Sequence, residues 1–226
     1  MRITFIGPVG AGKSAQSRRL AEALPFHNRA PRLSTGELVR AQIEARTPLG
    51  DELKRHHDAG EPAPDADILG LLLPHVRHAG GFVLDDFPAN VSQAKALDAE
   101  LGEHGAGGLH RVISLEGLTD EELAGRVLGG RVRSRATDVA YHLENDPPPG
   151  EGERSDPGPF VCRDDDTPEV LRRRLEAYRQ EHGRLKEHYE GRGILSVIDA
   201  RQSLDAVAGD VLEVLGHPER GEYYAV

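Results

Sequence analysis

Residues 7–14 carry the residue types and the spacing of a phosphate-binding loop. They fit the pattern G-x-x-x-x-G-K-[ST], in which glycines let the backbone curl until several N–H groups point at one anion. Lys13 adds a mobile positive charge, and the hydroxyl of Ser14 is a suitable ligand for Mg²⁺. We therefore expect a nucleotide-phosphate site here. The alternative is a glycine-rich turn that fits the pattern by chance.

The segments on both sides of this loop favour the phosphate site. Residues 2–6 are a short apolar run typical of a β-strand, and residues 14–24 have a helical pattern. A strand, a glycine loop and a helix in this order bring the positive end of the helix to the bound phosphate. The helix is expected to turn four positions inward: Ala15, Leu20, Ala21 and Leu24.

The composition indicates a compact protein and excludes several function classes. The chain has 226 residues, 38% hydrophobic and 29% charged, with a formal net charge of −10. Nucleic-acid binding requires a basic face, so the acidic balance argues against it. No apolar run reaches the roughly 18 residues of a membrane span, and the early P-loop leaves no room for a signal peptide. The single Cys162 cannot form an internal disulfide or a cysteine-rich zinc site. Together, these features predict a cytoplasmic protein without a membrane partner.

Strand-like and helix-like segments alternate along the chain. Residues 82–85, 112–115 and 194–198 are short, apolar and rich in β-branched side chains, as in buried parallel strands. The capping-box pattern S/T-x-x-E predicts helix starts at 34–37 and 119–122. This alternation predicts an α/β fold with a doubly wound parallel sheet.

A further helix is predicted to begin at Thr167. This threonine is a suitable N-cap, and the following Pro168 is favoured in a first turn because its missing N–H would have no intrahelical partner there. The inward face of this helix is expected to consist of four residues: Val170, Leu171, Leu175 and Tyr178.

Residues 129–166 break the alternation. They contain no sustained helical period, and proline and glycine are crowded at 147–150 and 156–159. A structureless loop of this length is uncommon in a compact domain unless it is functional or disordered. Two interpretations compete: a disordered linker, or a small lid of short strands over the active site. The lid is favoured by arginines that could meet phosphate, namely Arg126, Arg131, Arg133, Arg135, Arg154 and Arg163.

Several separated motifs together resemble the adenylate kinase family. They lie at residues 7–16, 34–40, 58–60 and 81–88 and at the end of segment 129–166, and their order and spacing match over nearly the whole chain. The resemblance implies a P-loop NTPase-type core with a five-stranded parallel sheet. It also implies a monomer that reversibly transfers the γ-phosphoryl group of ATP·Mg²⁺ to a nucleoside monophosphate, with AMP the first expectation.

The resemblance further implies three structural parts. Residues 1–33, 67–128 and 167–226 would form the core that carries the P-loop. Residues 34–66 would form an α-helical acceptor-binding insertion, and residues 129–166 would form the lid. A closing lid would keep water away from the γ-phosphate, so we expect the lid to move.

Roles for the donor side follow from the same resemblance. Lys13 would contact the β/γ oxygens of ATP, and Ser14 and Asp85 would hold Mg²⁺ through water. The alternative for Asp85 is a helix cap in a tight turn. The loop residues implied to contact ATP are Gly10, Ala11, Gly12, Lys13, Ser14 and Ala15. The arginines implied to bind phosphate are Arg126, Arg163 and Arg174, with Arg126 also contacting ATP, although any one of them could instead be a solvated helix charge.

The acceptor side of the resemblance involves five residues. Thr35 would approach the base of the acceptor, and Arg40 would bind its phosphate. Gln93 would hydrogen-bond the base, or it is the N3 member of a capping pair that begins three residues earlier. His57 stands where a flexible apolar residue usually lines the base pocket, and Asp86 stands where the family has glycine.

The chain departs from the family pattern at phosphate-binding positions. The pattern Asp-Gly-Phe-Pro-Arg reads Asp-Asp-Phe-Pro-Ala at 85–89, so Ala89 replaces an arginine that clamps the acceptor's phosphate. Gly130 stands where the family has a lid arginine, for which Arg133 or Arg135 could substitute. Three functions therefore remain open: a nucleoside-monophosphate kinase, a kinase for a different small-molecule acceptor, and a nucleotide-binding protein with little transfer.

Overall fold

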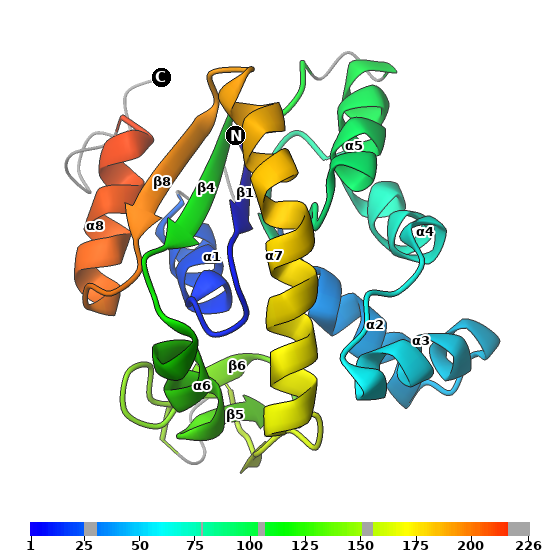
Figure 1. The fold of residues 1–226 in the computed structure, drawn as a ribbon, viewed down its shortest axis with the longest axis vertical. Coiled ribbons are helices and arrows are strands. Elements are labelled where there is room, and N and C mark those ends of the chain that lie inside the picture. The colour runs from blue at the N-terminus through cyan, green and yellow to red at the C-terminus, as the bar shows by residue number, and fades with distance from the viewer. Residues whose placement is uncertain (25–30, 78, 104–106, 151–155, 217–226) are drawn as a thin grey trace.

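A parallel β-sheet forms the centre of the molecule (Figure 1). The computed structural model describes residues 1–24, 31–77, 79–103, 107–150 and 156–216. Arg154, one of the predicted lid arginines, lies outside these ranges, as do residues 217–226, for which the sequence predicts no role. Within the described ranges the sheet has five strands: β1 (Arg2–Ile6), β2 (Arg32–Ser34), β3 (Phe82–Asp85), β4 (Arg111–Glu116) and β8 (Leu195–Asp199). Their order is β2-β3-β1-β4-β8, and every pairing is parallel. The predicted α/β fold of the P-loop NTPase type is confirmed.

Helices cover both faces of this sheet (Figure 1). They are α1 (Lys13–Ala23), α2 (Thr35–Glu44), α3 (Pro48–Ala59), α4 (Asp65–Val76), α5 (Val91–Glu103), α6 (Asp120–Leu128), α7 (Pro168–Glu190) and α8 (Leu204–Val214). On β1, Ile3 and Phe5 pack toward α1 and α8, whereas on β3, Phe82 and Leu84 pack toward α4 and α5. Because both faces are covered, the central strands are apolar at successive positions. In the part of the chain that the structure describes, no helix is both long and apolar enough to cross a membrane.

All three predicted helix starts are confirmed, because α2, α6 and α7 begin directly after Ser34, Thr119 and Thr167. Thr119 forms a complete capping box at the start of α6, and the hydroxyl of Thr167 accepts a hydrogen bond from the backbone of the first turn of α7. The capping box at Ser34 is wrong, because the side chain of Ser34 makes no cap hydrogen bond. Glu37 instead accepts a hydrogen bond of 2.7 Å from the half-buried guanidinium of Arg32, an interaction between charged groups that is stronger than a neutral cap bond.

Residues 129–166 contain a second, smaller sheet. Its antiparallel strands are β5 (Arg131–Ser134), β6 (Ala140–His142) and β7 (Phe160–Val161). The buried carboxylate of Asp156 accepts hydrogen bonds from the hydroxyls of Ser134 (2.5 Å), Thr137 (2.6 Å) and Tyr141 (3.1 Å). Burial and this carboxylate raise the pKa of Tyr141 to about 12. The segment therefore has a hydrogen-bonded centre of its own, which favours the lid interpretation over a linker.

Candidate functional site

The phosphate-binding loop connects β1 to α1. Gly7 has φ +143°, and a Cβ there would lie 2.7 Å from the carbonyl oxygen of Leu115, so only glycine fits. Gly12 has φ +96° and is the N-cap of α1. This backbone turns the N-terminus of α1, with its unpaired N–H groups, toward the space that an anion would occupy.

Lys13 lies folded over its own loop. Its side chain is 7% exposed, and Nζ donates hydrogen bonds of 2.7 Å to the carbonyl oxygens of Gly7 and Pro8. The carboxylate of Asp86 is 3.4 Å from the same nitrogen. An entering phosphate would therefore compete with three oxygens for this ammonium group.

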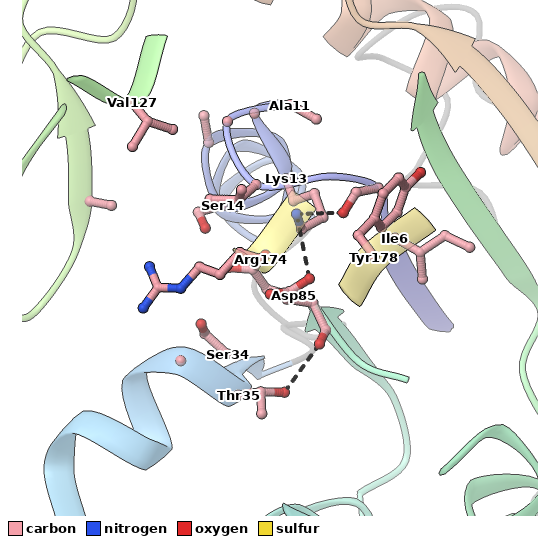
Figure 2. Close-up of a pocket in the computed structure, with 18 of the residues that line it drawn as sticks. Ile6, Ala11, Lys13, Ser14, Ser34, Thr35, Asp85, Val127, Arg174 and Tyr178 are labelled. Atoms are coloured by element: carbon pink, nitrogen blue, oxygen red, sulfur yellow. Dashed lines mark hydrogen bonds and ion pairs between the residues drawn. The ribbon is translucent and has the colours of Figure 1, made fainter. Parts of the chain in front are cut away.

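A cavity of about 720 Å³ opens beside the loop, within the range of cavities that hold small ligands. Each residue that the sequence predicted for the site lines it. On the donor side these are Gly10, Ala11, Gly12, Lys13, Ser14, Ala15, Asp85, Arg126, Arg163 and Arg174, and on the acceptor side Thr35, Arg40, His57, Asp86 and Gln93. Figure 2 shows the guanidinium of Arg174 extending from α7 into the space between Ser14 of the P-loop and Ser34 at the start of α2.

Asp85 occupies the end of β3 next to the loop, because the sheet register pairs it with Phe5. Its Oδ2 accepts a hydrogen bond of 2.7 Å from Arg32, whereas its buried Oδ1 has no hydrogen-bond partner. A buried carboxylate oxygen without a partner is costly, so this atom fits the water shell of a cation. Within the described ranges, no three acidic, histidine or cysteine side chains gather to hold a metal by themselves. That arrangement suits Mg²⁺, which is commonly shared between one or two carboxylates and the substrate's phosphates.

Asp165 binds two of the arginines that line the cavity. Arg163 donates to both of its oxygens (2.9 and 2.5 Å), and Arg174 donates to Oδ2 (2.6 Å). Although burial opposes it, these two arginines lower the pKa of Asp165. Nε2 of His57 lies 3.3 Å from the same carboxylate; burial lowers the pKa of this imidazole, and Asp165 acts in the opposite direction. One carboxylate thus joins α3, α7 and the end of segment 129–166.

The two predicted acceptor residues of α2 both contact other segments. The hydroxyl of Thr35 donates a long hydrogen bond of 3.5 Å to the carbonyl oxygen of Asp86, as Figure 2 also shows. Nε of Arg40 donates to Oδ2 of Asp138 in segment 129–166, at 2.7 Å. Arg40 therefore already binds an anion, which is the chemistry predicted for it.

Gln93 acts as a structural residue in the described conformation. Its Oε1 accepts from the backbone N–H of Ala89 (2.8 Å), its Nε2 donates to Asp65 (2.7 Å), and its own N–H donates to the side chain of Asn90 (2.9 Å). Only the last of these bonds belongs to the predicted capping pair, because the side chain of Gln93 accepts from Ala89 and not from Asn90. A contact of Gln93 with the acceptor's base stays a prediction.

The imidazole ring of His142 lies next to Gly130, the position where the family has a lid arginine. A Cβ on Gly130 would lie 3.1 Å from Cε1 of His142, so a side chain there is crowded. Neither expected substitute lines the cavity in the described conformation: Arg135 is exposed, and Arg133 is paired with Glu44 and Asp138. Arg131 lines the cavity instead and donates to Asp166.

Comparison with known proteins agrees with this geometry. The family described as "Adenylate kinase" matches residues 5–194. The chain belongs to the adenylate kinase family. It is 38% identical to the adenylate kinase of Methylorubrum populi over 95% of this chain and 96% of that protein, and 36% identical to that of Syntrophobacter fumaroxidans over 96% and 100%. It is also 38% identical to the adenylate kinase of Streptomyces coelicolor over 95% and 98%.

Membership of the adenylate kinase family makes the chain a phosphotransferase of nucleotide metabolism. The near-complete coverage of these relatives does not support the alternative of an unrelated small-molecule acceptor. The sequence patterns do not mark two residues that hold side chains of the cavity: Asp165, which binds two arginines, and Arg32, which binds Asp85. Both lie next to predicted motifs, but their role depends on partners far away in the sequence, which no local pattern marks.

Proposed function

We propose that the chain transfers the γ-phosphoryl group of ATP to a nucleoside monophosphate, with AMP as the preferred acceptor. The main support is that the P-loop, helices α2 and α3 and the arginine pair Arg163 and Arg174 all line one cavity. A donor phosphate and an acceptor phosphate bound in one cavity can be placed in line for direct transfer. The adenylate kinase relatives point to the same substrates.

In the proposed reaction, the main contribution of the protein is to neutralise the negative charge of the phosphates. The N–H groups of the P-loop and Lys13 bind the β- and γ-phosphates, and Arg40 binds the phosphate of AMP. An oxygen of that phosphate attacks the γ-phosphorus, the bond to the β–γ bridging oxygen breaks, and two ADP molecules result. Arg163 and Arg174 stabilise the charge on the transferring group. Mg²⁺, held by Asp85 and Ser14, would supply further positive charge at the phosphates.

Exclusion of water is the second requirement, and segment 129–166 can meet it. Arg18 of α1 donates to the carbonyl oxygen of Ala140 (3.0 Å) and to Asp146 (2.5 Å), and its guanidinium lies 4.7 Å from the centre of the Tyr141 ring. These contacts dock the small sheet on α1 beside the P-loop. A lid in this place keeps water from the γ-phosphate and so favours transfer over hydrolysis.

A coupled assay of ADP formation tests the proposal, with ATP, Mg²⁺ and each of AMP, CMP, UMP, GMP and the deoxynucleoside monophosphates. We expect AMP to be the best acceptor, with a turnover of about 1–10³ s⁻¹. Lys13→Ala should abolish transfer, whereas Lys95→Ala on the exposed face of α5 should leave it unchanged. Binding of ATP without transfer to any of these nucleotides would contradict the proposal and favour a nucleotide-binding protein.

A further inference from the structure

The carboxylate of Asp138 lies between arginines that come from two parts of the chain. Oδ2 accepts a hydrogen bond of 2.7 Å from Nε of Arg40 on α2, and Oδ1 accepts one of 2.9 Å from Nη1 of Arg133 on β5. The side chains of Arg40, Arg133 and Asp138 are 12, 22 and 19% exposed. An anion bound by two guanidiniums and largely removed from water has the surroundings of a bound phosphate.

Backbone features on both sides favour this arrangement. Asp138 has φ +59° in the turn between β5 and β6, a conformation that few residues other than glycine, asparagine and aspartate adopt. On α2, Gly36 leaves room for Arg40 to fold back, because a Cβ at Gly36 would lie 2.9 Å from Nη1 of that arginine. Arg133 also donates to Glu44 of α2, at 3.1 Å.

The charge balance around Arg40 favours an anion at this point. Burial and the neighbouring charge of Arg163 lower the pKa of Arg40, and Asp138 counteracts them. If Asp138 left without a replacement, the buried guanidinium of Arg40 would lose its hydrogen-bonded counter-ion, which is unfavourable. Arg40 and Arg163 both line the cavity, so an anion that enters there can take the place of the carboxylate.

We propose that Asp138 occupies the place of the acceptor's phosphate, and that Arg133 completes the phosphate site when AMP displaces it. This inference rests on the proposed function, because it assigns a second cation to the acceptor of that reaction. The family pattern supplies this cation from the position that Ala89 holds here. In this chain it comes from Arg133 on β5.

Titration calorimetry with AMP and with adenosine, both without ATP, tests the inference. Asp138→Asn keeps a residue that tolerates positive φ, and it removes the competing charge. We expect it to lower the Kd for AMP by about tenfold, the effect of one charge-assisted hydrogen bond, and to leave the Kd for adenosine unchanged. In that background, Arg133→Ala should weaken AMP binding by about tenfold. The matched control is Arg135→Ala, because Arg135 lies on the same segment and is exposed.

Three results would overturn the inference. The first is an AMP affinity that Asp138→Asn leaves unchanged. The second is an equal gain in affinity for AMP and for adenosine in Asp138→Asn, which would indicate easier opening of the cavity rather than competition with a phosphate. The third is an Arg133→Ala effect no larger than that of Arg135→Ala, with thermal unfolding confirming that each variant is folded. Because binding needs no transfer, a wild-type chain that binds AMP but does not phosphorylate it would contradict the proposed function alone.

Discussion

Asp86 lies against Lys13, with 3.4 Å between Oδ1 of the carboxylate and Nζ of the P-loop lysine. The family resemblance places Asp86 on the acceptor side, at a position where the family has glycine. Its carboxylate nevertheless contacts the donor loop. The backbone at Asp86 has φ +64°, so the glycine conformation is kept while a charge has been added.

Replacing Asp86 with glycine should strengthen ATP binding. The carboxylate is 62% exposed, so its ion pair with Lys13 is worth only about 0.2–1 kcal/mol. We expect Asp86→Gly and Asp86→Asn each to lower the KM for ATP by about two- to fivefold. Steady-state kinetics at saturating AMP measure the change. A higher KM in both variants would show that Asp86 assists ATP binding instead.

Restoring the arginine at Ala89 should strengthen AMP binding. Ala89 is exposed and lines the cavity, so a longer side chain has space. A charge-assisted contact with phosphate contributes about 1.5–3 kcal/mol, so Ala89→Arg should lower the KM for AMP by at least about tenfold. Ala89→Gln is the uncharged control, with a polar side chain that is shorter than arginine. If both variants behave like wild type, the acceptor's phosphate binds beyond the reach of this position.

Replacing Gly130 with the arginine of the family pattern should destabilise the chain and bring no gain in activity. Any Cβ at this position approaches the ring of His142 to 3.1 Å, and that ring accepts hydrogen bonds from the backbone N–H groups of Glu144 and Asn145. Gly130→Ala and Gly130→Arg should therefore both lower the thermal unfolding temperature. We expect no gain in kcat for Gly130→Arg, measured by the same coupled assay. A gain in kcat would show that the ring of His142 moves aside and that position 130 accommodates an arginine side chain.

The stability contributed by Asp165 should depend on pH. Its pKa in the folded chain is below the ordinary value of 3.8, so its stabilising effect is present above about pH 4 and is lost as the pH falls toward the folded pKa. Asp165→Asn leaves Arg163 and Arg174 without their counter-ion and should cost about 3–5 kcal/mol at pH 7. Urea unfolding at pH 7, 5 and 3 should show the difference from wild type shrinking at pH 3. The exposed neighbour Asp164, changed to Asn, should show a small and nearly constant difference.

Three strands of the central sheet were predictable because they are buried and mostly apolar. β1, β3 and β4 are of this kind, and their predicted positions are confirmed. β2 was not predicted as a strand from its own residues, since it is only three residues long and contains Arg32 and Ser34. It forms because β3 offers a parallel edge, which is a property of the folded sheet and not of the segment.

The site was predictable where its residues belong to contiguous motifs. The P-loop and the segments around Arg40 and Asp85 supply side chains that line one cavity, as their motifs predicted. The carboxylates that orient the arginines were not predictable. Asp165 and Asp138 are ordinary acidic residues in the sequence, and only the fold brings them to within hydrogen-bond distance of arginines on α7 and α2.

The place of β1 in the sheet sets the order in which the molecule can be assembled during synthesis. Ile3 pairs with Val83 on one side and with Arg111 on the other, so β1, which precedes the other four strands of this sheet along the chain, is also the middle strand. The P-loop follows β1 directly, and Gly7 packs on Leu115. Nascent chains that stop before β4 therefore carry the complete loop sequence but lack the walls that shape it. Nucleotide binding should accordingly begin only after β4 has emerged from the ribosome, and chains arrested at increasing lengths on the ribosome would reveal that onset.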